Sequence, residues 1–409
     1  MGSGDWPRRA SRFCRRRACR VVTRRICIFT GARSDFGLLQ PLIRAVMQDE
    51  LLELQLVVTG SHLAADFGLS VQEIEKAGIP IARKVDILGT SDSPADVARS
   101  AGRGVVGFAD ALEELNPNIV AVLGDRYEAL AAAFSSVILG IPVAHLHGGE
   151  VTEGSSDDSF RHAITKLASL HFVAAEPYRA RVVQMGENPE RVFLVGGLGV
   201  DAMARLPLLS RDEVEQRINF HIDSRTVLAT IHPATAGAAD SGFECDEMLA
   251  ALEEERDLRI VFTLANADAG GREVNEKIRA FVDRHPDRSI CFPSLGSQLY
   301  FSCLQFVKGL IGNSSSGLLE APSFHIGTIN IGDRQKGRLR SASVIDCAVD
   351  RQLIRDALSR LFSADFQKSV SSAVNPYGRG GATPEVLKIL KSVDLSKLRA
   401  KSFHDVQVA

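Results

Sequence analysis

The sequence predicts an α/β protein with two doubly wound domains that share one ligand-binding cleft. The chain has 409 residues, 45% of them hydrophobic, which is more than one ordinary domain holds. Short apolar runs of strand length alternate with stretches of helical period, a pattern typical of a parallel sheet covered on both faces. The alternation stops at a polar stretch, residues 207–225, and then resumes. We therefore expect the same architecture twice.

The first domain is expected over residues 26–205. It begins with Ile26–Thr30, an apolar run that ends at a glycine and predicts a buried strand followed by a turn. Similar runs predict strands at 54–59, 119–124, 142–147, 170–174 and 192–196, and helical periodicity falls around 38–48, 94–115, 127–139, 159–169 and 178–186. This order predicts parallel strands joined by crossover helices.

The second domain is expected over residues 206–375, followed by a loop and a helix over 376–400 that return to the first domain. Its strands are expected at 227–232, 259–264, 290–293, 307–312 and 328–332, and 384–393 has the pattern of a last helix. Open α/β sheets bind ligands beyond the carboxyl ends of their strands. Residues that directly follow strands are therefore the candidates for a functional site.

The charge distribution excludes two classes of partner. The net charge is −2, but residues 1–25 hold nine Arg and one Asp, which leaves −10 for residues 26–409. Nucleic-acid binding needs clustered Lys and Arg, so a body this acidic disfavours a nucleic-acid partner. No apolar run reaches the ~20 residues of a membrane span, so we expect a cytoplasmic protein with no membrane partner.

The N-terminal segment and the cysteines receive no catalytic role. Residues 1–25 have no periodicity and are expected to form a disordered basic arm. RNA binding, targeting or a chain start assigned too early are the alternatives. The seven cysteines show no Cys-x-x-Cys spacing, which favours buried free thiols over a metal or redox site.

Two polar motifs follow strands of the first domain. The turn Gly31–Gly37 leads into a helix whose free N–H groups can hold an anion, with Arg33 as a phosphate fork. The turn is no Gly-x-Gly-x-x-Gly fingerprint, which disfavours a dinucleotide, and an ordinary turn with a solvated Arg33 is the alternative. Asp125 and Arg126 place an acid beside a cation, suited to proton transfer and phosphate binding. A helix-capping Asp125 paired with Arg126 is the alternative.

The densest polar stretch follows the fifth strand. His147, Glu150 and Asp157 supply proton-transfer groups, and a Gly-Gly pair between them permits a close backbone approach to a ligand. His145, His147 and Glu150 are disfavoured as metal ligands, because the Gly-Gly turn breaks the alternation of the strand. For Asp157 and Asp158 the alternative is helix capping.

In the second domain, polar residues again follow the strands. His232 ends one strand, Asn266 follows the next, and Arg334 adds a cation after the last. A purely structural histidine is the alternative for His232. Within Gly312–Pro322, Ser314 and Ser315 form an anion cradle at a helix N-terminus.

Glu320 completes this second set, since an acidic group two turns into such a helix can accept hydrogen bonds from ribose hydroxyls. A flexible serine-rich linker is the alternative, which the apolar strand before it disfavours. Together the two domains describe a cleft for a nucleoside diphosphate attached to a group that is altered by proton transfer.

These motifs resemble the hydrolysing UDP-N-acetylglucosamine 2-epimerases of sialic-acid-type biosynthesis, along residues 26–395. The similar stretches are Gly-Asp125-Arg126, Gly149 to Lys166, His232-Pro233 and Gly312 to Glu320. The resemblance implies two Rossmann-like domains of the GT-B type with the active site in the interdomain cleft, usually in a homodimer. It implies neither NAD nor an essential metal.

The resemblance also implies a chemistry. The C2 proton is removed and UDP is expelled from C1, and the resulting 2-acetamidoglucal is hydrated to free N-acetylmannosamine. By analogy, Asp125 and Asp157 are the acid/base residues and His232 lies near the leaving phosphate. Asn266 assists in the nucleotide pocket and Glu320 binds ribose. The diphosphate is held by Arg33, Arg126, Ser314, Ser315 and Arg334.

Two departures from the family pattern leave questions open. Several members have a catalytic Glu where this chain has His147, with Glu150 three residues later. His147 replaces that carboxylate, or Glu150 moves in, or the substrate differs. The loop 375–379 also carries Arg379 where an acid is expected.

Four alternatives to the UDP-N-acetylglucosamine reaction remain. The nearest is the same hydrolysing reaction on UDP-2,4-diacetamido-2,4,6-trideoxyglucose, for legionaminic acid. A non-hydrolysing epimerase would release UDP-N-acetylmannosamine instead. A GT-B glycosyltransferase would transfer the sugar to an acceptor, and a sugar-nucleotide sensor would bind without turnover.

Overall fold

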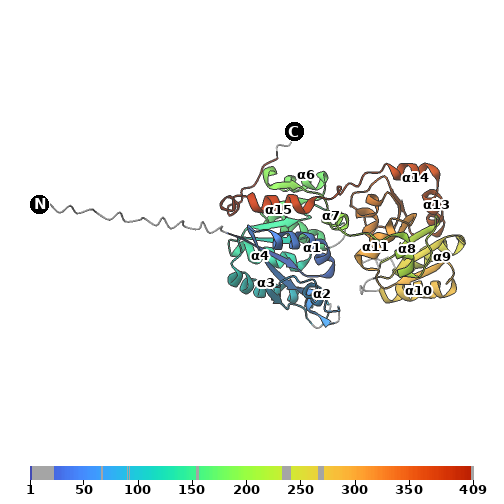
Figure 1. Cartoon of the computed structure of the whole chain (residues 1–409), viewed down its shortest axis with the longest axis horizontal. Helices are drawn as coiled ribbons and strands as arrows, with labels where there is room; N and C mark the ends of the chain where they lie inside the picture. The colour runs from blue at the N-terminus through green and yellow to red at the C-terminus, as the bar shows by residue number, and fades with distance from the viewer. Residues whose placement is uncertain are drawn as a thin grey trace.

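A computed structural model describes residues 1, 23–65, 68–89, 91, 93–152, 156–232, 241–265 and 271–406. The chain forms two lobes, each a parallel sheet with helices on both faces (Figure 1). This confirms the predicted fold of two Rossmann-like doubly wound domains. The arm predicted for residues 1–25 lies outside the described residues, apart from its two ends, and Arg24 and Arg25 belong to the first strand.

The first sheet has the order β3-β2-β1-β4-β5-β6-β7, and all its neighbours are parallel. Its strands are β1 (Arg24–Thr30), β2 (Leu52–Thr59), β3 (Arg83–Val85), β4 (Ile119–Leu123), β5 (Val143–Leu146), β6 (Leu170–Val173) and β7 (Val192–Leu194). The helices that join them are α1 (Arg33–Gln48), α2 (Val71–Lys76), α3 (Pro94–Leu115), α4 (Tyr127–Ile138), α5 (Ser156–Leu167), α6 (Glu176–Gln184) and α7 (Leu198–Ala204).

The second sheet repeats this topology in the order β10-β9-β8-β11-β12-β13. Its strands are β8 (Thr226–Thr230), β9 (Arg259–Thr263), β10 (Ser289–Phe292), β11 (Gly309–Gly312), β12 (Gly327–Ile331) and β13 (Val344–Cys347). Its helices are α8 (Arg211–Ile218), α9 (Ser241–Glu254), α10 (Gly271–Arg284), α11 (Gly296–Leu304), α12 (Ser316–Leu319), α13 (Arg351–Leu361) and α14 (Ala364–Ser371).

The central strands are apolar throughout because helices cover both faces of each sheet. Along β1, Ile26 and Ile28 pack in the core that α1 shares, while Cys27 and Phe29 face the core on the opposite side, which α3 and α4 share. Successive strand residues point to opposite faces, so one uninterrupted apolar run serves two cores.

The last helix, α15 (Ala382–Ser392), lies in the lobe of the first domain, far along the chain from the helices beside it (Figure 1). Val386 and Leu390 are buried in the same core as α1. Asp201 of α7 holds the start of α15, since its carboxylate accepts from the backbone N–H groups of Gly381 at 2.7 Å and Thr383 at 3.2 Å.

Some elements differ from the sequence prediction. The edge strands β3 and β13 were not predicted; β3 has only three residues, Arg-Lys-Val, and is too short and polar to show strand periodicity. Helix α1 begins at Arg33, five residues before the predicted stretch, because Phe36 extends the apolar stripe of the helix by one turn.

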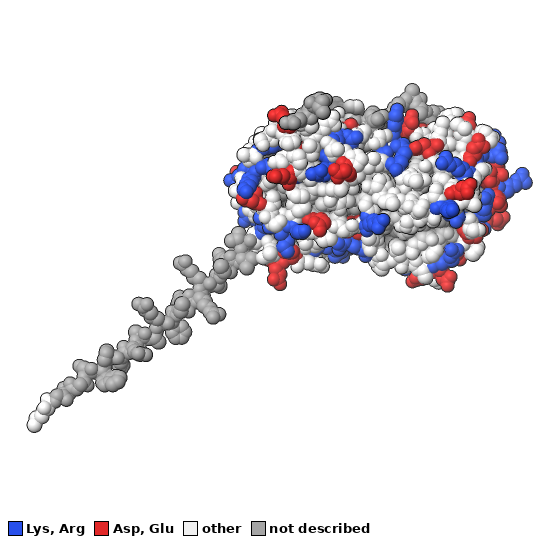
Figure 2. Space-filling view, turned by 90° about the horizontal axis from the view of Figure 1, so that it is seen from above, with Lys and Arg blue, Asp and Glu red and all other residues white. Residues whose placement is uncertain are grey.

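The face of the molecule drawn in Figure 2 carries mixed charge. On the face drawn in Figure 2, Lys and Arg side chains alternate with Asp and Glu rather than gathering in one basic patch. None of the helices in the described ranges combines the length and the apolar composition that crossing a bilayer requires.

Candidate active site

The predicted site residues lie at equivalent places in the two sheets. In each sheet the strand order reverses between two neighbours, β1 and β4 in the first and β8 and β11 in the second. Such a switch point opens a crevice at the carboxyl ends of the strands. Asp125 follows β4, and His232 and Asn313 follow β8 and β11.

Gly312 is required at the second switch point. Its φ is +128°, and a Cβ built there would lie 1.8 Å from the carbonyl oxygen of Thr230. Only glycine combines that backbone conformation with such a close approach of two strands.

Asp125 is held by a buried arginine from α5. Arg161 is 2% exposed, and its guanidinium contacts the carboxylates of Asp125 and, at 3.1 Å, Asp158. Burial lowers the pKa of Arg161 to about 10, so it still carries its charge at neutral pH. The alternative in which Asp125 pairs with Arg126 is therefore wrong, since Arg126 pairs with Glu128 at 2.9 Å.

Of the two neighbouring acids of α5, Asp158 has a structural role. Its Oδ1 accepts from the backbone N–H of Thr152 at 2.7 Å, which ties Thr152 to the helix. Asp157 lies in the same first turn and is half-buried. The first turn of α5 therefore contains Asp158, which binds the backbone of Thr152, and Asp157, which was predicted to transfer protons.

His147 holds Glu150 in place. His147 Nδ1 lies 2.7 Å from Glu150 Oε1, and the backbone N–H of Leu198 donates to His147 Nε2 at 3.1 Å. Because Nε2 accepts that bond, the ring proton sits on Nδ1 and is donated to Glu150. His147 also has a φ of +63°, a strained conformation for a non-glycine residue. In this structure both His147 nitrogens are occupied, which favours Glu150 as the working carboxylate.

The surroundings of Glu150 keep its carboxylate ionised. Glu150 is buried, and burial alone would raise its pKa, but the interactions with His147 and the charge of Arg338 outweigh burial and lower it. A buried, ionised carboxylate beside a histidine is suited to accept a proton.

A second acid cluster lies at the first switch point. Glu128 is 4% exposed and contacts Arg126, and both line a crevice with Gly31, Asp35 and Thr59. Burial raises the pKa of Asp35 to about 6. The cluster therefore holds one arginine between two acids, one of which titrates near neutral pH.

Arg33 does not join this cluster. Its side chain is 68% exposed and pairs with Glu73 at 2.6 Å on the surface. Its predicted contact with a phosphate remains a prediction.

In the second domain, Asn313 fixes the position of His232. The Asn313 amide accepts from the His232 backbone N–H at 2.7 Å and donates to the His232 carbonyl at 2.8 Å. The Asn313 carbonyl in turn accepts from Arg334 at 3.2 Å and from Gln335 at 2.9 Å. Two predicted residues, His232 after β8 and Arg334 after β12, therefore meet at Asn313, which follows β11.

The predicted anion cradle lies next to this asparagine. Ser314 and Ser315 directly precede α12 and are half-buried. Glu320 follows α12, is 9% exposed, and burial raises its pKa to about 7. Asn266 lies outside the described residues.

The two domains touch beside these residues. A Cβ built on Gly199 of α7 would lie 3.1 Å from Glu320 Oε1, so Glu320 faces the first domain. Next to it, the buried hydroxyls of Tyr178 and Tyr377 lie 3.1 Å apart, and both contact the backbone of Leu339. Glu320, Tyr178 and Leu339 therefore lie at the boundary between the two domains.

Sequence reasoning missed several residues of the site. Arg161 lies within a quoted motif, but its role became visible only when Asp125 and α5 were brought together. Glu128 is two residues from Arg126, and Asn313 directly precedes the serines. Both could have been found from their closeness in sequence to predicted site residues. Asp35 lies within the predicted glycine turn.

Among the described residues, no group of three or more His, Cys, Asp and Glu side chains is arranged to hold a metal ion. The groups present are carboxylates paired with arginine or histidine. Their chemistry is proton transfer and electrostatic stabilisation of an anion.

Two parallel doubly wound sheets, with paired carboxylates after the strands of the first, define a two-domain α/β protein of the Rossmann-like type. Comparison with known proteins narrows this class. Residues 44–391 match the family model described as UDP-N-acetylglucosamine 2-epimerase. The chain belongs to this family, in its branch of hydrolysing 2-epimerases.

Relatives match over nearly the whole chain. The GDP/UDP-N,N'-diacetylbacillosamine 2-epimerase (hydrolyzing) of Campylobacter jejuni is 37% identical over 384 residues, 94% of this chain and 99% of that protein. The UDP-N,N'-diacetylbacillosamine 2-epimerase (hydrolyzing) of Legionella pneumophila is 34% identical, covering 91% and 97%. The UDP-GlcNAc 2-epimerase structure from Neisseria meningitidis, bound to UDP-GlcNAc, has a TM-score of 0.77 at 18% identity, covering 90% and 99%.

Proposed function

We propose that this enzyme hydrolyses UDP-2,4-diacetamido-2,4,6-trideoxyglucose, the sugar nucleotide also called UDP-N,N'-diacetylbacillosamine, with inversion at C2. Two paired carboxylates after the strands of the first domain, Asp125 with Arg161 and Glu150 with His147, support the proposal, and we assign the phosphate site to the residues around Asn313. The hydrolysing relatives from Campylobacter jejuni and Legionella pneumophila support the choice of sugar, because both are named for it.

The proposed reaction has two steps. A carboxylate takes the C2 proton, the C1–O bond breaks, and UDP leaves, which gives a C1–C2 double bond. Water then adds hydroxide to C1 and a proton to C2 from the opposite face, which gives the free 2-epimerised sugar. Two proton carriers on opposite faces of the ring are needed, and we assign them to Asp125 and Asp157, with Glu150 as a third carboxylate held by His147.

The diphosphate is assigned mainly to the second domain, with two arginines of the first domain reaching its outer oxygens. Ser314 and Ser315 offer hydroxyl and backbone donors, and His232 and Arg334 lie around the same asparagine. We assign His232 to the leaving phosphate, Arg126 and Arg33 to its outer oxygens, Glu320 to ribose, and Asn266 to the nucleotide pocket. Charge that develops on the leaving group is stabilised by groups already in place.

Conversion of UDP-N-acetylglucosamine to N-acetylmannosamine, for sialic-acid-type sugars, is the second candidate, because the matching family model carries that substrate's name. Purified enzyme is incubated separately with both sugars as UDP and GDP conjugates, and the products are identified by mass spectrometry and NMR. Free 2-epimerised sugar from the diacetamido substrate supports the proposal. Faster release of N-acetylmannosamine favours the second candidate, and a product still linked to nucleotide contradicts both.

We also propose that two copies form a homodimer through the α3 and α4 surface. Five apolar side chains there are more than one third exposed, Val106 at 66%, Phe134 at 46%, Val137 at 41%, Ile138 at 71% and Leu139 at 42%. Clustered exposed apolar groups are typical of protein interfaces. Light scattering tests this: the wild type should have twice the chain mass, and Ile138→Asp should give monomers. A wild-type monomer at micromolar concentration contradicts it.

We place the enzyme in the cytoplasm. The described cysteines Cys27, Cys245, Cys291, Cys303 and Cys347 are all free thiols, as expected in a reducing compartment. Fractionation of the source cells tests this assignment, and recovery outside the cytoplasmic fraction would contradict it.

A further inference from the structure

We propose that the C-terminal segment, residues 395–406, positions the acid site of the first domain, with Lys401 as its contact and His145 as the relay to Asp125. This inference rests on the proposed role of Asp125 in proton transfer. Lys401 and His145 touch no reacting atom, so they are positioning residues.

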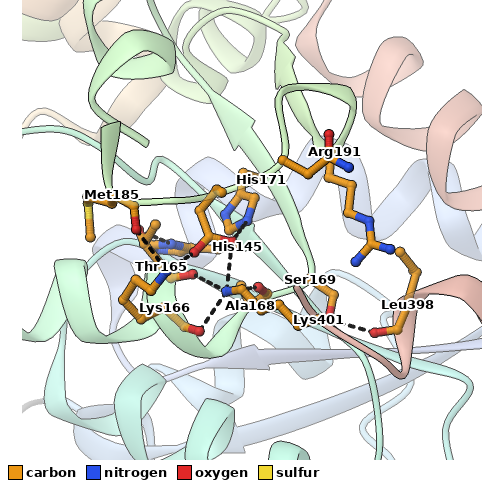
Figure 3. Close-up of polar contacts among 12 residues, drawn as sticks. His145, Thr165, Lys166, Ala168, Ser169, His171, Met185, Arg191, Leu398 and Lys401 are labelled. Atoms are coloured by element: carbon orange, nitrogen blue, oxygen red, sulfur yellow. Dashed lines mark hydrogen bonds and ion pairs between the residues drawn. The ribbon is translucent and has the colours of Figure 1, made fainter. Parts of the chain in front are cut away.

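Lys401 binds the end of the helix that carries the acids. Its ammonium donates to the carbonyl oxygens of Thr165 at 3.2 Å, Lys166 at 2.6 Å and Ala168 at 2.8 Å, at the carboxyl end of α5 (Figure 3). The last carbonyls of a helix have no partner within the helix, and its dipole favours a cation there. Lys401 thus completes α5 at the end opposite to Asp157 and Asp158.

The ammonium of Lys401 is also anchored by a buried acid. Glu187 is 3% exposed and contacts Lys401 at 2.7 Å, Lys166 at 2.5 Å and His171 at 3.0 Å. Burial opposes ionisation of Glu187, but hydrogen bonds from His171, Lys166 and Lys401 outweigh it and lower its pKa to about 2. Glu187 therefore stays charged at neutral pH and holds Lys401 against the helix.

Contacts on both sides of Lys401 fix the segment to the first domain. The Leu398 carbonyl accepts from Ser169 at 2.9 Å, and the Lys397 carbonyl accepts from Arg191 at 2.6 Å. Beyond Lys401, the His404 backbone N–H donates to the Gly186 carbonyl at 2.9 Å. Figure 3 shows Arg191, Ser169 and Leu398 beside Lys401. The segment is docked over its length, and Lys401 is the side chain that binds the last carbonyls of α5, while the ring of Phe403 lies 5.0 Å from the ammonium of Lys166.

Thr165 connects the end of α5 to the turn before Asp125 through His145. Its hydroxyl lies 3.1 Å from His145 Nδ1, and His145 Nε2 lies 2.7 Å from the carbonyl oxygen of Gly124. A carbonyl only accepts, so Nε2 carries the proton and Nδ1 accepts from Thr165. Burial lowers the pKa of His145 to about 3, so the neutral ring keeps these two bonds at neutral pH.

Helix α5 therefore holds Asp125 from two directions. One turn before Thr165, Arg161 contacts the Asp125 carboxylate, and through His145 the helix also fixes the carbonyl directly before Asp125. Movement of α5 by a fraction of an ångström would displace both contacts. Misplacement of about 1 Å can cost a catalytic site roughly 100-fold in rate.

The test compares Lys401→Met, which removes the ammonium, with Lys401→Arg, which keeps a cation. Lys397→Met is the matched control, since the Lys397 side chain is exposed on the same segment. We expect Lys401→Met to lower kcat about 10-fold or more with KM and the Kd for UDP within twofold of wild type, and Lys401→Arg to recover most of kcat. Lys401→Met with a lower Tm but wild-type kcat would overturn the proposal.

A second pair covers a failure of Lys401→Met to fold. Thr165→Val removes the hydroxyl that donates to His145, and Thr165→Ser keeps it. Thr165→Val should lower kcat and Thr165→Ser should not. Equal kcat in both variants would contradict the proposal that His145 connects α5 to Asp125.

A readout that needs no turnover separates this inference from the proposed function. Hydrogen–deuterium exchange of peptides covering 119–128 and 156–169 should be faster in Lys401→Met than in wild type. Faster exchange with an inactive wild type leaves the positioning role standing and contradicts the proposed function. An active wild type, with exchange and kcat both unchanged in Lys401→Met, supports the proposed function and contradicts the positioning role of Lys401.

Discussion

The two halves of the site are built by different means. In the first domain, each acid is paired with a basic side chain: Asp125 with Arg161, Glu150 with His147, and Glu128 with Arg126. In the second domain, the side chain of Asn313 holds the backbone of His232, and the serines of the cradle are half-buried. The first arrangement fixes the direction of the side chains that we propose as proton carriers, and the second holds the backbone of the site that we propose for the phosphates. Substitutions should therefore affect kcat on one side and nucleotide affinity on the other.

The largest effect is expected for Asp125→Asn. The amide keeps the shape of the side chain but cannot take up a proton, so kcat should fall by about 10³-fold or more. The Kd for UDP, measured by calorimetry, should stay within about threefold, since the cradle is unchanged. Asp110→Asn, an exposed acid on α3, is the control and should behave as wild type. Wild-type kcat in Asp125→Asn would remove this residue from the reaction.

Next in size is the Glu150 and His147 pair. Glu150→Gln should lower kcat about 100-fold, within the range of a lost proton carrier. His147 lowers the pKa of Glu150, so His147→Ala should raise that pKa. As the pH falls, Glu150 is then protonated at a higher pH than in the wild type. The acid limb of the profile of kcat against pH should therefore shift to higher pH. An unmoved acid limb would show that His147 does not control Glu150.

A smaller effect, on affinity, is expected for Asn313→Ala. Loss of both bonds to the His232 backbone should weaken UDP binding about tenfold, with the fold of the first domain intact. Asn330→Ala, a change at a buried asparagine of β12 that contacts Asp346, serves as the control. If both variants weaken UDP binding equally, the effect is one of stability and not of the cradle.

The smallest effect is a pH dependence. Burial raises the pKa of Glu320 to about 7, and its ionised form is the one that accepts hydrogen bonds from ribose. Affinity for UDP should therefore rise by up to about tenfold from pH 6 to pH 8. Glu320→Gln should remove this rise while leaving the titration of UDP itself. A rise of the same size in Glu320→Gln would exclude Glu320 from the ribose site.

The features of the fold and of the site that could be predicted are those encoded by residues close together in the sequence. Alternating apolar runs predicted the sheets, because strands such as Ile119–Leu123 are buried on both faces. The placement of site residues after strands followed from the same pattern. The edge strand β3 was missed because three partly exposed residues carry no such pattern.

The partners of the site residues could not be predicted, because they come from distant segments. Arg161 lies 36 residues from Asp125, and Lys401 lies more than 230 residues from the carbonyls it binds. No local spacing encodes such contacts. The exposed position of Arg33, paired with Glu73, is a further case, since only the packing of α1 against α2 brings these two together.

The most direct test of the central claim is proton NMR of the reaction in deuterated buffer, with UDP-2,4-diacetamido-2,4,6-trideoxyglucose as substrate and Asp125→Asn as control. We predict free UDP and a free 2-epimerised sugar that carries deuterium at C2, with neither formed by the variant. A released sugar that retains its C2 proton would contradict the account, because the C2 proton would then never have been removed.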